Sequence, residues 1–158
     1  MKKIVSLLLV LMLMLTLAVG CSPKEPTKQP SEEPATVDFS ITVNGTEFTN
    51  ENTKDIEFVT VSINKKDKEG KLKEAQWQGY RIKDVLEASG ITEYNTVKVA
   101  AGDGYSVDLT KEVVEAETTL LGFVKDGEAL SSEDAPRLTV EGEGSNVWIK
   151  GVASIEAK

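Results

Sequence analysis

The 158-residue sequence contains no histidine and only one cysteine, Cys21. Catalytic triads that use histidine and zinc sites built from histidine and cysteine are therefore excluded by composition. A single cysteine also cannot form a disulfide within the chain. A hydrophobic core must supply the stability without covalent or metal crosslinks, and redox chemistry would require a bound cofactor.

Positive charge is scarce as well. The chain has 18 lysines and arginines against 26 acids, a net charge of −8. Nucleic-acid binding depends mainly on basic side chains that neutralise phosphates, so this composition argues against a nucleic-acid partner. No Walker or dinucleotide fingerprint is present, and acid pairs such as Asp103 with Asp108 lack the spacing of an EF-hand. We predict neither a metal site nor a catalytic residue from these patterns.

Residues 1–20 have the pattern of a bacterial signal peptide. Lys2 and Lys3 precede an apolar run that ends in small residues, without the basic flank of a stop-transfer segment. Residues 17–21, Leu-Ala-Val-Gly-Cys, resemble the lipobox of bacterial lipoproteins, although alanine stands where leucine is more usual. We expect cleavage before Cys21 and lipidation of its thiol, which would anchor an extracytoplasmic protein to the cell membrane. The alternative is an ordinary cleaved signal with an incidental cysteine.

The segment 21–36 contains four of the five prolines, interspersed with polar residues. It is predicted to be a disordered tether, which at ~3.1 Å per residue could reach roughly 45 Å from the lipid surface. Removal of residues 1–20 would take away Lys2 and Lys3 and change the net charge from −8 to −10. Residues 37–158 have the length and apolar content of one domain.

Within 37–158, short segments of alternating or continuous apolar residues predict strands, and two segments of helical period predict short helices. Residues 56–63 are apolar or β-branched on both faces, which predicts a central strand. The result is a mixed α+β domain that is mostly β. The predicted strands are 37–43, 56–63, a strand ending near Trp77, 97–101, 105–109, 119–124, 137–140 and 147–155, and the predicted helices are 82–89 and 110–114.

Five motifs follow one another in a characteristic order: Trp-Gln-Gly-Tyr-Arg-Ile-Lys-Asp-Val-Leu at 77–86, Asp-Gly-Tyr at 103–105, Asp-Gly-Glu-Ala-Leu at 126–130, Pro-Arg-Leu at 136–138 and Trp-Ile-Lys-Gly-Val at 148–152. This series resembles the molybdopterin-binding domain of the sulfite oxidase family over about residues 56–156. The resemblance implies the sulfite oxidase-like fold, whose loops hold a molybdenum-bearing pterin in catalytic relatives.

The resemblance also implies a ligand pocket. Relatives ligate the metal with a cysteine before the Trp-x-Gly segment, where this chain offers only Ser62 as the nearest polar candidate; a hydroxyl is a poor substitute for a soft thiolate. Relatives also place positive charge near the cofactor phosphate, which corresponds here to Arg137 and Lys150. The turn containing Asp103 and Tyr105 would border the pocket.

Each of these residues also has an ordinary structural role available to it. Trp77 and Trp148 could stack on a flat ligand or simply pack in the core. Arg137 could pair with Glu133 or Asp134. Lys150 could lie on a solvated strand face, and Tyr105 could bury its ring with the hydroxyl outward.

Three functions remain open. The first is a non-catalytic, ligand-binding lipoprotein that keeps the fold without the metal-binding thiol, and therefore without a cofactor. The second is a molybdopterin-dependent oxidoreductase with an atypical site. The third is a module that docks on another envelope protein. The missing cysteine favours the first and third, as does a signal peptide without paired arginines, because pterin enzymes usually load their cofactor before export.

Overall fold

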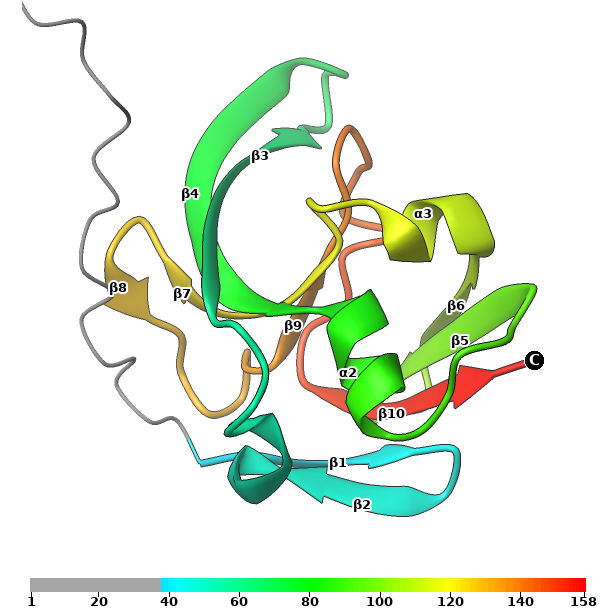
Figure 1. The fold of residues 1–158 in the computed structure, drawn as a ribbon. Coiled ribbons are helices and arrows are strands. Elements are labelled where there is room, and N and C mark those ends of the chain that lie inside the picture. Colours follow the sequence, from blue (N-terminus) through cyan, green and yellow to red (C-terminus); the bar gives the residue numbers. More distant parts are fainter. Residues whose placement is uncertain (1–37) are drawn as a thin grey trace, which may run out of the picture. The chain divides into compact units, whose positions relative to one another are not determined.

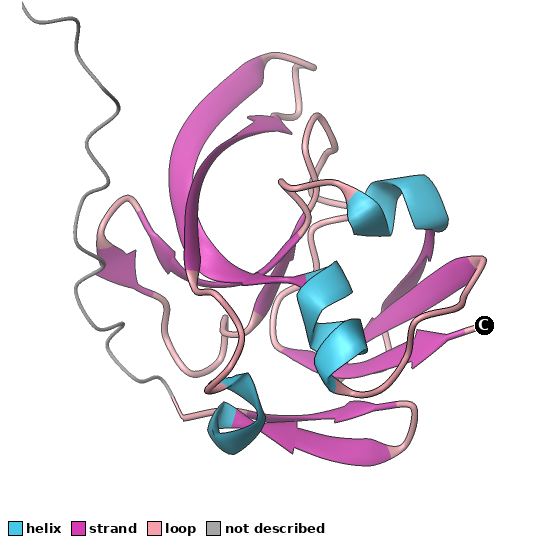
Figure 2. Ribbon diagram, in the orientation of Figure 1, coloured by secondary structure: helices cyan, strands magenta, loops and turns pink. Residues whose placement is uncertain are grey.

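Two five-stranded β-sheets and two short α-helices make up residues 38–158, the part of the chain that this computed structural model describes (Figures 1 and 2). These residues belong to one compact unit that spans Glu33–Lys158. The mostly β, mixed fold predicted from the sequence is confirmed. The predicted signal peptide, Cys21 and the tether lie outside the described residues.

The first sheet contains both ends of the domain and has the order β2-β1-β10-β5-β6. Its only parallel pair joins β1 to β10, with Thr42 opposite Ser154. Asn44 and Gly45 turn β1 into β2 with positive φ values of 47° and 80°, as a tight hairpin requires. The strands are β1 (Ser40–Val43), β2 (Thr46–Thr49), β5 (Thr96–Ala101), β6 (Ser106–Thr110) and β10 (Val152–Ala157).

The second sheet is built around a long, curved β3–β4 hairpin (Figure 1). Its order is β3-β4-β7-β8, and β9 also pairs with β7. The strands are β3 (Val59–Lys66), β4 (Leu72–Arg81), β7 (Leu120–Lys125), β8 (Glu128–Ala129) and β9 (Arg137–Thr139).

The prediction of a central strand at 56–63 was wrong. β3 begins at Val59, continues to Lys66 and pairs only with β4, so it lies at the edge of its sheet. Val59 and Ile63 are buried whereas Thr60 is exposed, the alternation of a strand with one covered face. The apolar residues Ile56 and Phe58 precede the strand and pack against the larger core instead.

The two predicted helices are confirmed as α2 (Ile82–Ala88) and α3 (Lys111–Glu115). Ile82, Val85 and Leu86 lie on one face of α2 and are fully buried. Gly90 follows the helix with φ of 77°, the left-handed conformation that commonly ends a helix. A 3₁₀ helix, η1 (Asn50–Thr53), follows β2, and neither β2 nor η1 was predicted.

The strand predicted at 147–155 was also wrong in its first half. β10 begins only at Val152, and residues 147–151 form a loop that carries Trp148 and Lys150. Gly151 has a φ of 53°, and a Cβ at this position would lie 3.0 Å from the carbonyl oxygen of Glu133. This left-handed, tightly packed position interrupts an extended chain.

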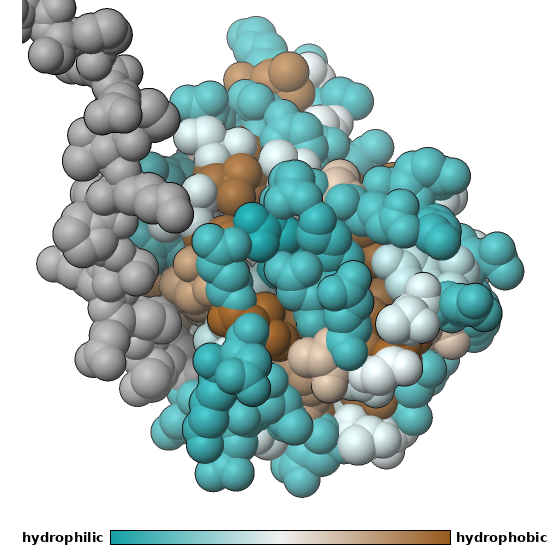
Figure 3. All heavy atoms as spheres, in the orientation of Figure 1, coloured by the Kyte–Doolittle hydropathy of each residue, from teal (hydrophilic) through white to brown (hydrophobic). Residues whose placement is uncertain are grey.

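The core consists of two clusters. The larger draws buried side chains from both sheets, α2 and α3. The smaller lies on the β3–β4–β7 side and contains Val59, Ile63, Trp77, Leu120 and Trp148. On the face drawn in Figure 3, apolar side chains reach the surface only in separate small areas among hydrophilic ones. Among the described residues, neither helix has the length and hydrophobicity to span a bilayer.

Candidate functional site

Trp77 of β4 and Trp148 of the 147–151 loop meet edge to face in the smaller core cluster. Their ring centroids are 5.4 Å apart at an interplanar angle of 70°. A Cβ on Gly122 of β7 would lie 3.0 Å from Cε3 of Trp77, so this glycine leaves room for the ring. Trp77 is 2% exposed and Trp148 is 4% exposed. Both rings therefore serve the core, and neither offers an open face on which a ligand could stack.

Two cations lie against this aromatic pair. The Lys65 ammonium lies 5.0 Å from the ring centroid of Trp148, and the Arg137 guanidinium carbon lies 5.9 Å from that of Trp77. Lys65 shares a face of β3 with Ile63, and Arg137 opens β9 opposite Gly122 of β7. These geometries are typical of cation–π contacts.

Lys125 and Lys150 complete a group that we call the basic cluster: Lys65, Lys125, Arg137 and Lys150. Partial burial lowers the pKa of Lys65 below its ordinary value, and repulsion from the other three cations lowers it further. Burial also lowers the pKa of Arg137, against the attraction of Asp134. Lys65 is therefore close enough to Arg137, Lys125 and Lys150 to be repelled by each of them.

Two acids compensate part of this charge. Lys150 forms an ion pair with Asp134 at 2.6 Å, and Lys125 lies 3.7 Å from Asp126. The hydrogen bond from Lys150, with the attraction of Arg137, holds the pKa of Asp134 below its usual value. Among the described residues no acid lies within 4.0 Å of Arg137, so the alternative of an ion pair with Glu133 or Asp134 is not formed, although Asp134, which is bonded to Lys150, attracts the guanidinium. Lys150 is half-exposed in a loop, not on a strand face.

The buried N–H groups of the site differ in their partners. Trp148 Nε1 donates a hydrogen bond to the carbonyl oxygen of Val140 at 2.8 Å. Trp77 Nε1 and Arg137 Nε are buried and have no hydrogen-bond partner among the described residues. An unpaired buried donor is costly, so these two groups mark a place where an acceptor is missing.

The predicted turn residues Asp103 and Tyr105 connect to the same loop. Asp103 Oδ1 accepts a hydrogen bond from the Tyr105 amide at 2.9 Å and so fixes the turn. The Tyr105 hydroxyl donates to the carbonyl oxygen of Asn146 at 2.6 Å, while half of the side chain is exposed. The alternative that Tyr105 packs its ring with the hydroxyl outward does not describe the structure, because half of the side chain is exposed and the hydroxyl is bonded to Asn146. Tyr105 holds the loop that carries Trp148 and Lys150.

The structure does not bring Ser62 together with the other predicted residues. Ser62 is exposed and pairs in register with Gln76, whereas the neighbouring pair Val61 and Trp77 points to the core face. Because successive side chains of a strand alternate between faces, Ser62 lies on the side of the sheet opposite Trp77.

Sequence reasoning missed Lys65 and Lys125. The predicted strand ended at residue 63, three residues before the end of β3. With the strand extended to Lys66, the alternation of Val61, Ile63 and Lys65 would have placed Lys65 on the core face. No comparable signal marked Lys125, which ends β7 beside the Asp126–Gly127 turn.

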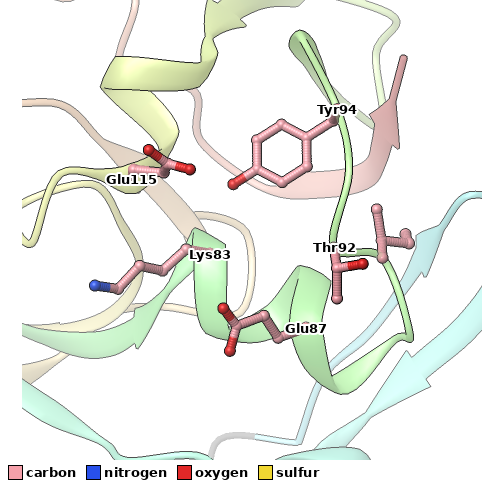
Figure 4. Close-up of a pocket in the computed structure, with 6 residues that line it drawn as sticks. Lys83, Glu87, Thr92, Tyr94 and Glu115 are labelled. Atoms are coloured by element: carbon pink, nitrogen blue, oxygen red, sulfur yellow. The ribbon is translucent and has the colours of Figure 1, made fainter.

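A separate hollow of about 300 Å³ lies between α2, α3 and the segment before β5 (Figure 4). The Tyr94 hydroxyl and the carboxylates of Glu87 and Glu115 point toward the space between these elements, and burial and these acids raise the pKa of Tyr94. The Lys83 ammonium is held by Glu117. None of the predicted site residues lines this hollow. Its lining residues are Lys83, Glu87, Ile91, Thr92, Tyr94 and Glu115.

The family model of the oxidoreductase molybdopterin-binding domain matches the sequence of residues 33–158, which is most of the chain. The chain belongs to this family. The order of motifs from Trp77 to Val152 therefore reflects membership of the molybdopterin-binding, sulfite oxidase-type domains, as the sequence resemblance predicted. No curated protein matches the chain.

The donor set of this family member does not fit the metal of a molybdopterin cofactor. Residues 38–158 contain neither cysteine nor histidine, and within them no three or more acids group in a way that could hold a metal ion. Molybdenum in this fold calls for a soft thiolate, and the nearest hydroxyl candidate, Ser62, faces away from Trp77. The basic cluster, by contrast, suits an anionic group.

Proposed function

We propose that this protein is a lipid-anchored extracytoplasmic lipoprotein whose molybdopterin-oxidoreductase-like domain binds a ligand without catalysing a redox reaction. One observation carries the proposal: the domain retains the family fold and a positively charged site, yet residues 38–158 supply no thiolate or imidazole to ligate molybdenum. A ligand-binding role needs only the fold and the positively charged site, and it needs neither a thiolate nor an imidazole.

The N-terminal sequence supports the same proposal. Residues 1–21 combine a basic start, an apolar run and a lipobox-like end, and they contain no pair of arginines. A general secretory signal of this type exports an unfolded chain. An unfolded chain cannot carry a preloaded pterin across the membrane, which favours a role independent of the cofactor.

Metal and pterin analysis of the native protein tests the non-catalytic role. We expect full-length protein purified from the membranes of its source cells to contain molybdenum and fluorescent pterin far below one equivalent per chain, because the domain has no soft ligand for the metal. Inductively coupled plasma mass spectrometry and oxidised-pterin fluorescence measure the two. One equivalent of either, with electron transfer to an artificial acceptor, would replace this proposal with the catalytic alternative.

Lipidation is tested by metabolic labelling with a fatty acid. Cys21→Ser is expected to abolish incorporation of the label into the chain, because a serine hydroxyl cannot form the thioether that carries the diacylglycerol. Ser22→Ala is the matched control and should label as the wild type does. Equal labelling of Cys21→Ser and the wild type would show that the anchor lies elsewhere.

A further inference from the structure

The turn between β3 and β4 concentrates positive charge in an otherwise acidic domain. Residues 65–73, which we call the hairpin tip, contain five lysines and two acids, a net charge of +3. The other described residues contain 9 basic and 21 acidic side chains, a net charge of −12. Lys65 lies against Trp148, and the other four lysines of the tip are exposed. The exposed lysines are Lys66, Lys68, Lys71 and Lys73.

Only part of this charge is neutralised within the tip. The Lys71 ammonium lies 2.9 Å from a carboxylate oxygen of Glu69, and the Lys73 ammonium lies 3.4 Å from one of Asp67. The side chains of both lysines are more than 70% exposed, so water screens these ion pairs. Among the described residues, the other two exposed lysines of the tip have no acid within 4.0 Å.

The hairpin tip has a defined turn. Asp67 Oδ1 accepts hydrogen bonds from the amides of Glu69 at 2.9 Å and Lys71 at 3.0 Å, and the Asp67 amide donates to the carbonyl oxygen of Lys71 at 2.9 Å. Gly70 supplies the left-handed position of the turn, with a φ of 78°. Because the turn is already ordered, a partner that binds it need not bear the entropic cost of ordering it.

An apolar side chain stands among these charges. Leu72 is 58% exposed, and Tyr105 is the only other large apolar side chain that is exposed in the described part of the chain. Leu72 pairs in register with Lys66, so the two side chains are neighbours on one face of the hairpin. A lysine stem can follow apolar surface while its ammonium stays in water. An exposed leucine beside lysines suits the interface of a bilayer, where hydrocarbon adjoins anionic headgroups.

The position of the tip makes it the part of the domain that can approach a negative surface. The turn between β3 and β4 lies at the upper end of the domain in Figure 1, and the β1–β2 hairpin lies at the opposite end. An anionic surface repels the acidic remainder of the domain and attracts the tip. The uneven charge therefore favours one orientation of the domain over such a surface.

We propose that the hairpin tip docks on an anionic lipid bilayer, with Leu72 entering the headgroup interface and the exposed lysines facing the lipid phosphates. The inference rests on the proposed function, because a lipid anchor at Cys21 would keep the domain beside such a surface. A hydrophilic polyanion would use the lysines equally well but would gain nothing from Leu72, so the leucine favours the bilayer. Docking holds the anchored domain in one orientation on the membrane.

A fluorescent probe on the lipid-anchored protein in reconstituted vesicles gives the readout. Glu69→Cys places a thiol for an environment-sensitive fluorophore at the tip, and Thr46→Cys is the matched position in the β1–β2 hairpin; both sites are exposed. With phosphatidylglycerol in the vesicles, we expect the probe at position 69 to emit at shorter wavelength and to be shielded from a dissolved quencher. Phosphatidylcholine alone, or high salt, should remove most of this shift. The probe at position 46 should emit alike in all vesicles.

Substitutions in the probe-labelled protein test the two components of the contact. Lys66→Gln combined with Lys68→Gln is expected to lower the equilibrium constant for docking about 25-fold, about fivefold for each lysine. Lys54→Gln combined with Lys158→Gln removes the same charge from exposed positions outside the tip and should leave docking unchanged. Leu72→Ser should lower the constant about tenfold, because less apolar area enters the interface. All five side chains are exposed, so the melting temperatures should match that of the wild type.

Equal emission from the two probe positions, or equal docking of the wild type and the variant with Lys66→Gln and Lys68→Gln, would overturn the inference. A response that polyphosphate reproduces and that Leu72→Ser leaves intact would overturn it in favour of a hydrophilic polyanion. The proposed function fails in a different way, through a free thiol at Cys21 of the wild type or stoichiometric molybdenum. In a Cys21→Ser background, vesicles added to the dissolved protein then provide the same comparison of variants.

Discussion

Replacing Trp77 with alanine is expected to lower the free energy of unfolding by about 3–5 kcal/mol, the cost of emptying a large aromatic site in a packed core. Trp77 is 2% exposed and packs against Trp148, the face of Gly122 and the guanidinium of Arg137. The cavity left by the ring would border β7, β9 and the 147–151 loop, and these packed segments could fill it only by moving their backbones. Urea unfolding followed by far-ultraviolet circular dichroism measures the change.

Phenylalanine substitutions separate packing from hydrogen bonding at the two tryptophans. Trp148→Phe removes the 2.8 Å hydrogen bond from Nε1 to the Val140 carbonyl, whereas Trp77→Phe removes no hydrogen bond, because Trp77 Nε1 has no partner among the described residues. Trp148→Phe should therefore cost about 1 kcal/mol more than Trp77→Phe. Equal costs, or a larger cost at Trp77, would contradict the assigned roles.

Gly79→Ala is expected to be the most damaging exchange of a single small residue, with a loss of about 3 kcal/mol or more, at the upper end of overpacking effects. A Cβ at Gly79 would lie 2.2 Å from the carbonyl oxygen of Leu121 and 2.8 Å from Cα of Gly122. These are backbone atoms of the neighbouring strand β7, so no side-chain rotation can relieve the contact. The strand pairing of β4 with β7 would have to open.

Gly102→Ala is the matched control for this prediction. A Cβ there meets nothing within 4 Å, and no positive φ constrains the position. The substitution should be neutral or stabilise by about 0.4–1 kcal/mol through the loss of freedom in the unfolded chain. Thermal unfolding of both variants measures the difference, and similar melting temperatures for the two would refute the close approach of β4 and β7.

The fold could be predicted from local patterns because most of its elements are locally encoded. The helical period of Ile82, Val85 and Leu86 predicted the buried face of α2. Local sequence patterns failed where contacts with distant segments of the chain decide the structure. The motif that begins at Trp77 contains Gly79, but no local pattern shows that Gly79 lies within β4, where the backbone of β7 leaves no room for a Cβ.

The candidate site was predicted only in part, for a related reason. The family motifs indicated Arg137 and Lys150, but no motif states which face of β3 a side chain occupies, so Ser62 was included and Lys65 was not. The end of β3 decides whether Lys65 belongs to the strand at all, and element boundaries are the weakest part of sequence reasoning. The contact of Lys65 with Trp148 joins residues 83 positions apart, which periodicity cannot reveal.

The parallel pairing of β1 with β10 sets the order in which the domain can be completed. Thr42 lies opposite Ser154, so β1 pairs on one side with β2, which follows it directly, and on the other side only with β10, the last strand of the domain. Contacts of such long sequence separation form late and slow the folding reaction. The first sheet can close only when β10 has joined it, so the pairing of β1 with β10 makes completion of this sheet depend on the most distant segment of the domain.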